Sequence, residues 1–183
     1  MSETYTLSNS KNSLLQNKRV FYALLFIYLV IMLLPAYWLD VFETTDARYA
    51  EISREMISNG NYLEPFYNGI KHFHKPPFTY WATAAGMHIF GINGLGARFF
   101  GAVAAVVTII FVRKIALLLS DDEEIADNSV MILGSSLLFM IVGHIVSTDI
   151  YLTCFTTISL YYLFNQIYGQ RQTKNIVMFA LVS

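Results

Sequence analysis

The chain has 183 residues, of which 55% are apolar and only 14% are charged. Soluble domains carry roughly a quarter charged residues, so this composition indicates a membrane protein. The net charge of -1 argues against a nucleic-acid partner, because no surplus of Lys and Arg is present to neutralise phosphates. The single cysteine, Cys154, excludes an intramolecular disulfide.

The N-terminal part predicts a cytoplasmic tail followed by a membrane span. Residues 1–19 are polar and include Lys18 and Arg19, and the run 20–39 that follows carries no charge. A hydrocarbon core needs about 20 helical residues, so this run is long enough to span. Basic residues mark the cytoplasmic side of a span, and the run has no small-residue cleavage site of a signal peptide. We therefore predict a retained span whose far end leads outside.

The predicted outer loop, residues 40–94, contains the longest polar segment of the chain. Apolar residues recur at helical spacing over 46–58, and Gly60 is placed to end that helix. A second helix is expected at 77–90, which is too short to span. We predict that both helices lie at the membrane surface.

Three further apolar runs predict spans at 95–119, 126–146 and 150–168, and a fifth run begins at 176. Alternating directions place the basic residues that end the second and fourth spans on the cytoplasmic side, as the positive-inside rule expects. The fifth run is too short to span. We therefore expect residues 20–183 to be the N-terminal part of a longer transmembrane domain.

Two acids are predicted on the same outer side. Asp46 falls in the first turn of the 46–58 helix, and Asp149 falls at the start of the last complete span. Two separated carboxylates could serve as a general base and an orienting partner. Helix capping is the alternative for both, because the N-terminal end of a helix favours an acid.

The outer loop also holds residue types that bind phosphates and metal ions. Lys75 precedes Pro76 and Pro77, which restrict its backbone, so its ammonium is aimed at a particular phosphate or simply meets lipid headgroups. His72 and His74 alternate along an extended segment and could bind a divalent cation together with an acid. Two histidines alone are short of a usual metal ligand set.

Several of these motifs together resemble one family. The chain resembles the N-terminal part of the ArnT-like and protein O-mannosyltransferase-like glycosyltransferases of the GT-C fold. The matching stretches are residues 43–56, Asn68-Gly69, residues 73–77, Tyr80-Trp81 and Phe90-Gly91.

The resemblance implies an all-α, multi-span transmembrane helix bundle, truncated here, with interfacial helices in the first outer loop. Members are bacterial inner-membrane enzymes that take a sugar from a polyprenyl-phosphate carrier on the outer side. They attach it to a lipid, glycan or protein hydroxyl by direct displacement at the anomeric carbon. A non-catalytic module that binds or transports lipid-linked sugars, and an inactive truncated fragment, are the alternatives.

The resemblance also implies roles for particular residues. It assigns Asp46 and Asp149 to catalysis, with Glu43 as a weaker candidate acid. Phosphate binding is expected of Lys75, Arg48 and Tyr49. A divalent cation, if bound, is expected at His74 and His72. The chain departs from the family at two positions, since Thr45 stands where an acid is common and His74 stands where an acid usually precedes Lys-Pro.

Overall fold

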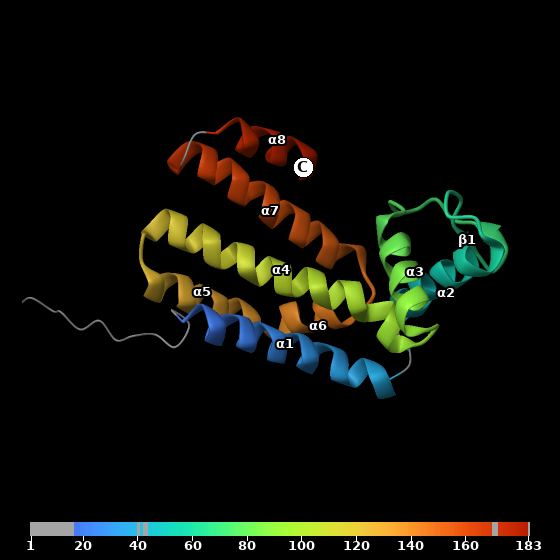
Figure 1. The fold of residues 1–183 in the computed structure, drawn as a ribbon. Coiled ribbons are helices and arrows are strands. Elements are labelled where there is room, and N and C mark those ends of the chain that lie inside the picture. The colour runs from blue at the N-terminus through green and yellow to red at the C-terminus, as the bar shows by residue number, and fades with distance from the viewer. Residues whose placement is uncertain (1–16, 40, 42–43, 170–171, 183) are drawn as a thin grey trace, which may run out of the picture.

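The computed structural model describes residues 17–39, 41, 44–169 and 172–182. These residues form eight helices and one two-stranded antiparallel hairpin (Figure 1). In chain order the elements are α1 (Lys18–Trp38), α2 (Thr44–Asn59), β1 (Phe66–Tyr67), β2 (Ile70–Lys71), α3 (Phe78–Phe90), α4 (Gly94–Ser120), α5 (Glu123–Ser135), α6 (Leu137–His144), α7 (Thr148–Tyr168) and α8 (Thr173–Val182). The two predicted interfacial helices correspond to α2 and α3.

The long helices form a bundle, and α2, α3 and the hairpin form a lobe at one end of it (Figure 1). Helix α4 is central, because it packs against α1, α3, α5, α6 and α7. Its inward face carries small residues such as Ala104 and Ala105. Small residues let helix backbones approach closely where no hydrophobic effect drives their association, which allows one helix to contact so many others.

The directions of the helices alternate as the sequence predicts. Gly94, at the start of α4, lies close to the carbonyl of Leu39 at the end of α1. Arg113, near the end of α4, lies 5.0 Å over the ring of Phe21 near the start of α1. Helices α1 and α4 are therefore antiparallel. Gly101 lies near Ile150, so α7 starts at the same end of the bundle as α4.

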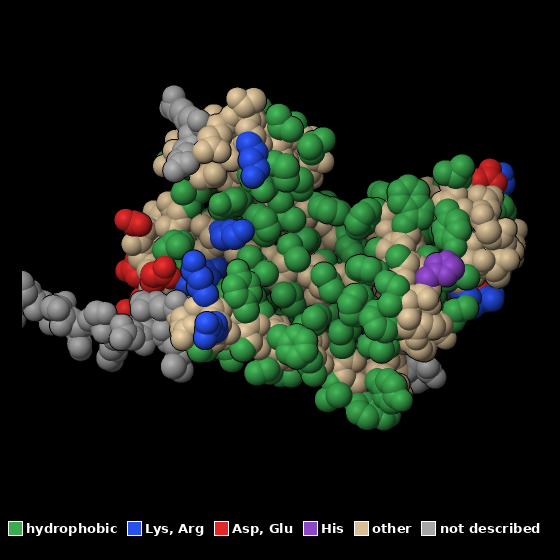
Figure 2. Space-filling model, in the orientation of Figure 1, with side chains coloured by type: hydrophobic (Ala, Val, Ile, Leu, Met, Phe, Trp, Pro, Cys, Tyr) green, Lys and Arg blue, Asp and Glu red, His purple; other side chains and the backbone are tan. Residues whose placement is uncertain are grey.

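Helices α1 and α4 are long and apolar enough to cross a membrane, and the bent pair α5–α6 is a third candidate if it counts as one span. Figure 2 shows hydrophobic side chains over the middle of the molecule and charged side chains toward its two ends. Within the described ranges, α7 is long enough at 21 residues but is not among the helices that are apolar enough to count as span candidates. The chain is a membrane protein, while the span at 150–168 and the orientation of the bundle stay predictions.

The span predicted at 126–146 falls on two helices, α5 and α6, which are bent relative to each other by 61°. Ser136 has extended backbone angles there and is both the end of α5 and the start of α6. The side chain of Ser135 donates a hydrogen bond to the carbonyl of Met131 at 2.7 Å. Gly and Ser neighbours such as Gly134-Ser135-Ser136 are a common cause of sharp kinks.

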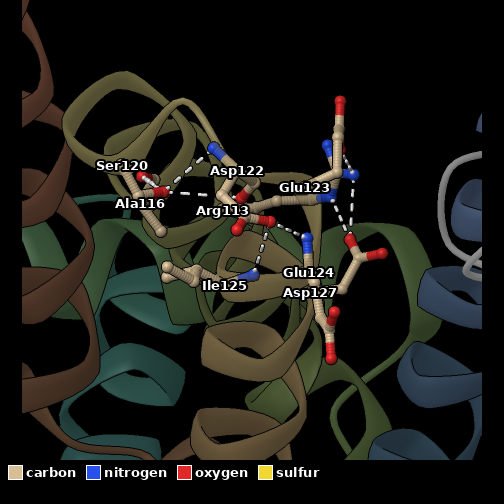
Figure 3. A network of polar contacts seen from close by, with 8 residues as sticks. All are labelled: Arg113, Ala116, Ser120, Asp122, Glu123, Glu124, Ile125 and Asp127. Atoms are coloured by element: carbon tan, nitrogen blue, oxygen red, sulfur yellow. Dashed lines mark hydrogen bonds and ion pairs between the residues drawn. The ribbon is translucent and has the colours of Figure 1, made fainter. Parts of the chain in front are cut away.

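The turn between α4 and α5 is closed by a polar network (Figure 3). The side chain of Arg113 donates to Asp127 at 3.0 Å and also pairs with Glu123. Asp122 caps α5 by accepting from the backbone N–H of Glu124 at 2.8 Å. An arginine near the end of an apolar helix thus meets two acids of the next helix, which fixes the angle between α4 and α5.

The crossing of α3 and α4 depends on two glycines, which gives a test of the fold. A Cβ added at Gly86 would lie 2.1 Å from the carbonyl oxygen of Gly96. We expect Gly86→Ala to force the helices apart and to cost roughly 1–3 kcal/mol or more, as overpacking does. Gly134→Ala is the matched control, because its Cβ would meet Tyr28 at an ordinary 3.8 Å. Thermal melting of the detergent-solubilised protein should fall only for Gly86→Ala, and equal melting of the two variants would contradict the close crossing.

Candidate active site

The lobe at the end of the bundle is built by packing α2 flat against α3. Ile52 and Met56 of α2 are almost fully buried, and the rings of Tyr49 and Tyr80 lie 5.6 Å apart. Met87 of α3 belongs to the same cluster. The helical spacing of these apolar residues is what turns one face of α2 toward α3, and it leaves Arg48 on a neighbouring face.

A buried carboxylate attaches the hairpin to α2. Asn68 and Gly69 form its turn with positive φ angles of 52° and 74°, as the Asn-Gly pair predicts. Glu55 accepts hydrogen bonds from the backbone N–H of Asn68 at 2.6 Å and of Gly69 at 3.4 Å. The backbone N–H of His72 then donates to the carbonyl of Pro65 at 2.8 Å. These bonds fix the segment that carries the two histidines.

Asp46 is buried in an ion pair at the base of this lobe. Its side chain is 2% exposed, and that of Arg98 is 6% exposed. Arg98 donates to one carboxylate oxygen at 2.6 Å, and the backbone N–H of Val146 donates to the other at 2.6 Å. Arg98 also donates to the carbonyl of Leu39 at 2.7 Å. The Asp46–Arg98 pair therefore joins the end of α1, the first turn of α2, the start of α4 and the α6–α7 linker.

The starts of α3 and α7 meet beside the pair. The hydroxyl of Thr79 donates to the hydroxyl of Thr148 at 3.3 Å, and the ring of Phe78 lies 5.4 Å from that of Tyr151. Because Lys75 closely precedes α3 and Asp149 is in the first turn of α7, both lie near this joint. Lys75 and Asp149 are exposed, so a ligand at the joint can reach them.

The two histidines lie together on the hairpin side of the lobe. Their ring centroids are 4.5 Å apart, and His72 is half-buried. Burial lowers the pKa of His72 below 6.5, and the nearby His74 and Arg48 charges lower it further. Arg48 also acts electrostatically on Tyr80, whose pKa burial raises to about 12. The charge of Arg48 therefore acts on both His72 and Tyr80.

These positions divide the residues predicted from the sequence into two groups. Lys75 and Asp149 are exposed near the α3–α7 joint, and Arg48 lies close to His72. Asp46 and Tyr49 are buried, at 2% and 7% exposed, and Glu43 lies outside the described residues. The chemical roles of all these residues stay predictions.

The histidine pair does not by itself form a complete metal site. Among the residues that the structure describes, no group of three or more His, Cys, Asp or Glu side chains could hold a metal ion. His72 and His74 would supply two ligands at most, whereas a protein zinc site uses three or four.

Arg98 is a site residue that sequence reasoning missed. It stands near the start of the apolar run 95–119, as a charged residue among small and aromatic ones. Ionisable residues in such runs usually face the interior of the bundle and pair there. That rule applied to Arg98 would have predicted a buried acid as its partner, although not which acid.

A family model described as dolichyl-phosphate-mannose-protein mannosyltransferase matches residues 74–183. The chain belongs to this family. Among its relatives, an uncharacterized protein of Aquifex aeolicus is 33% identical over 143 residues, which are 78% of this chain and 28% of the relative. The undecaprenyl phosphate-alpha-4-amino-4-deoxy-L-arabinose arabinosyl transferase of Pseudomonas savastanoi is 32% identical over 122 residues, which are 67% of this chain and 22% of that protein.

Two solved structures of ArnT from Cupriavidus metallidurans have the same fold as this member of the mannosyltransferase family. The apo structure has a TM-score of 0.74 at 23% identity, covering 90% of this chain and 30% of ArnT. The structure bound to undecaprenyl phosphate has a TM-score of 0.77 at 22% identity, covering 93% and 31%. The predicted all-α, multi-span bundle of GT-C type is confirmed. The chain spans about a quarter of the length of the curated relatives that it matches.

The arrangement around His72 predicts how that residue titrates. NMR of the histidine side chains should give His72 a pKa below 6.5, because burial and two nearby cationic groups oppose its protonation. As the pH falls below 6.5, His72 becomes protonated in the unfolded chain before it does so in the folded chain. The free energy of unfolding therefore decreases in this pH range, and His72 does not lower it at higher pH.

Two substitutions separate the causes of this shift. His74→Gln and Arg48→Gln should each raise the pKa of His72, whereas Lys71→Gln, which removes a charge held by Glu64 at 2.7 Å, should leave it unchanged. A His72 that titrates normally in all four proteins would show that the histidines and Arg48 do not lie together.

Proposed function

We propose that the complete protein transfers a sugar from a polyprenyl-phosphate carrier to a lipid, glycan or protein hydroxyl at the outer face of the bacterial inner membrane. The observation that supports this most directly is the α3–α7 joint, which has an exposed lysine on one side and an exposed carboxylate on the other. Family membership supports the reaction class. The likeness to an ArnT structure that holds undecaprenyl phosphate supports the type of carrier.

The cations of the lobe are suited to the phosphate of the carrier. Lys75 is followed by Pro76 and Pro77, which restrict its backbone. It lies just before the N-terminal end of α3. That end adds the positive pole of the helix dipole. Arg48 supplies a second positive charge on the neighbouring helix. Together they stabilise the charge that builds up on the leaving phosphate as its bond to the sugar breaks.

Asp149 is suited to activate the acceptor. It is exposed in the first turn of α7, and Ser147 caps that turn by accepting from the backbone N–H of Asp149 at 3.1 Å. In the reaction the acceptor oxygen bonds to the anomeric carbon, and the bond from that carbon to the phosphate oxygen breaks. The acceptor proton passes to the Asp149 carboxylate. The products are the glycosylated acceptor and the polyprenyl phosphate, whose charge is met by Lys75 and Arg48.

The topology that this function needs is also part of the proposal. The N-terminal tail is cytoplasmic, and the lobe of α2, α3 and the hairpin lies on the outer side. The basic residues near the end of α4 support this direction. Carrier binding without sugar transfer by the complete protein would instead favour a binding or transport module.

Lys75→Ala tests the proposed phosphate contact. Losing a hydrogen bond to a charged group costs about 1.5–3 kcal/mol, so carrier binding should weaken roughly 10- to 100-fold. Lys71→Ala is the control, since it removes an exposed lysine of the same loop that pairs with Glu64 instead. Binding of polyprenyl phosphate to the complete protein in nanodiscs measures both. Equal affinity of the two variants would mean that Lys75 only meets lipid headgroups.

Asp149→Asn tests the proposed base. Removing a general base lowers a rate by about 10²- to 10⁴-fold, so kcat for sugar transfer should fall by that order while carrier binding persists. Asp121→Asn, at the opposite end of the bundle, makes the same chemical change and should keep wild-type activity. Transfer assays with a radiolabelled polyprenyl-phosphate sugar would decide, and normal turnover by Asp149→Asn would exclude the assignment.

A further inference from the structure

The Asp46–Arg98 pair uses both oxygens of the acid that the sequence places first in the site. Arg98 holds one oxygen and the backbone N–H of Val146 holds the other, each at 2.6 Å. Asp46 is 2% exposed and Arg98 is 6% exposed. A general base has to come within hydrogen-bond distance of the proton that it takes. Asp46 could do so only by giving up a partner and leaving Arg98 as an uncompensated buried charge, which is strongly unfavourable.

The pair instead connects the two elements that carry the proposed site. On one side, Arg48 follows Asp46 by two residues on α2. On the other side, the N–H of Val146 belongs to the α6–α7 linker, and the next residue, Ser147, caps the turn that carries Asp149. One carboxylate therefore sets the position of α2 relative to the start of α7. Arg98 adds the end of α1 through the carbonyl of Leu39.

We propose that Asp46 is a positioning residue and that its pairing with Arg98 holds Arg48 and Asp149 at their working separation. Asp46 does not exchange a proton with the acceptor. This inference rests on the proposed glycosyl transfer. It gives Asp46 a positioning role and leaves Asp149 as the acid that takes up the acceptor proton.

The side chains allow a charge-free version of the same contacts. In Asp46→Asn the introduced amide oxygen can still accept from Val146, and its NH2 group can donate. In Arg98→Gln the introduced amide can accept from that NH2 group and donate to the carbonyl of Leu39. The double variant thus keeps the hydrogen bonds and removes both charges, while each single variant leaves one buried charge without its partner.

The experiment compares the wild type, the two single variants and the double variant in the complete protein. Each single variant should lose transfer activity by roughly 100-fold or more, the size of effect of a misplaced catalytic geometry. The double variant should recover to within about tenfold of wild type, with an unchanged KM for the acceptor. An amide cannot accept the acceptor proton, so recovery is incompatible with Asp46 as the base.

A distance measurement gives a readout that does not depend on activity. Spin labels at Thr45→Cys and Leu152→Cys, both exposed positions, report the separation of α2 and α7 in a Cys154→Ala background. We expect a broadened distance distribution in each single variant and a narrow, wild-type distribution in the double variant.

The outcomes separate this inference from the proposed function. A double variant with restored distances but no transfer would make Asp46 catalytic and overturn the inference. Single variants with unchanged distances would overturn it as well. A wild-type protein that positions α2 and α7 normally but transfers no sugar to any acceptor class would defeat the proposed function, and the distances would still decide whether the pair positions the two helices.

Discussion

The lobe depends on one buried ion pair, which meets four segments of the chain at a single point. Asp46 and Arg98 are both nearly inaccessible, and hydrogen bonds hold the pair in place: the acid accepts from Arg98 and from Val146, and the arginine also donates to Leu39. A charge buried without such partners is costly, and a broken pair is worse than none. The starts of α2, α4 and α7 are therefore fixed together, and no one of them can shift alone.

The central position of α4 explains how this junction can exist. Its first turns carry Gly96, which lies against Met87 of α3, and Gly101, which lies near Ile150 of α7, so both helices pack closely around the segment that carries Arg98. Larger side chains there would separate the helices, and the guanidinium would no longer bridge α1 and α2. Close packing of small residues at one end of the bundle and the ion pair at the same end are thus parts of one arrangement. At the other end, Arg113 and the acids of α5 serve the same purpose at the α4–α5 turn.

Much of this architecture could be predicted from the sequence, because an apolar run and the basic residues that flank it can be recognised locally, without knowledge of the tertiary fold. The ranges expected for the two short helices, 46–58 and 77–90, differ little from α2 and α3, since Gly60 and Pro77 end and begin them by backbone chemistry. The break at Ser136 was not predicted, because the length and apolarity of the run are those of one span, and neighbouring Gly and Ser residues such as Gly134-Ser135-Ser136 do not by themselves require a bend. The partner of Asp46 could not be predicted either. Helical periodicity placed Asp46 on α2, but only the tertiary fold brings Arg98, 52 positions further on, within 2.6 Å.

Both departures from the family pattern replace an expected acid, so each removes a negative charge from the outer loop. Where the resemblance expects acids, the chain has Thr45 and His74, and Asp46 is paired with Arg98. Burial, and after it the nearby charges of His74 and Arg48, lower the pKa of His72. Among the described residues that are proposed to act at the α3–α7 joint, Lys75 and Asp149 are exposed and Arg48 is half-buried. The proposed carrier phosphate would meet the charges of Lys75 and Arg48 and the positive end of the α3 dipole. In the proposed reaction the carrier phosphate pairs with these cations, and Asp149 is the carboxylate that receives the acceptor proton.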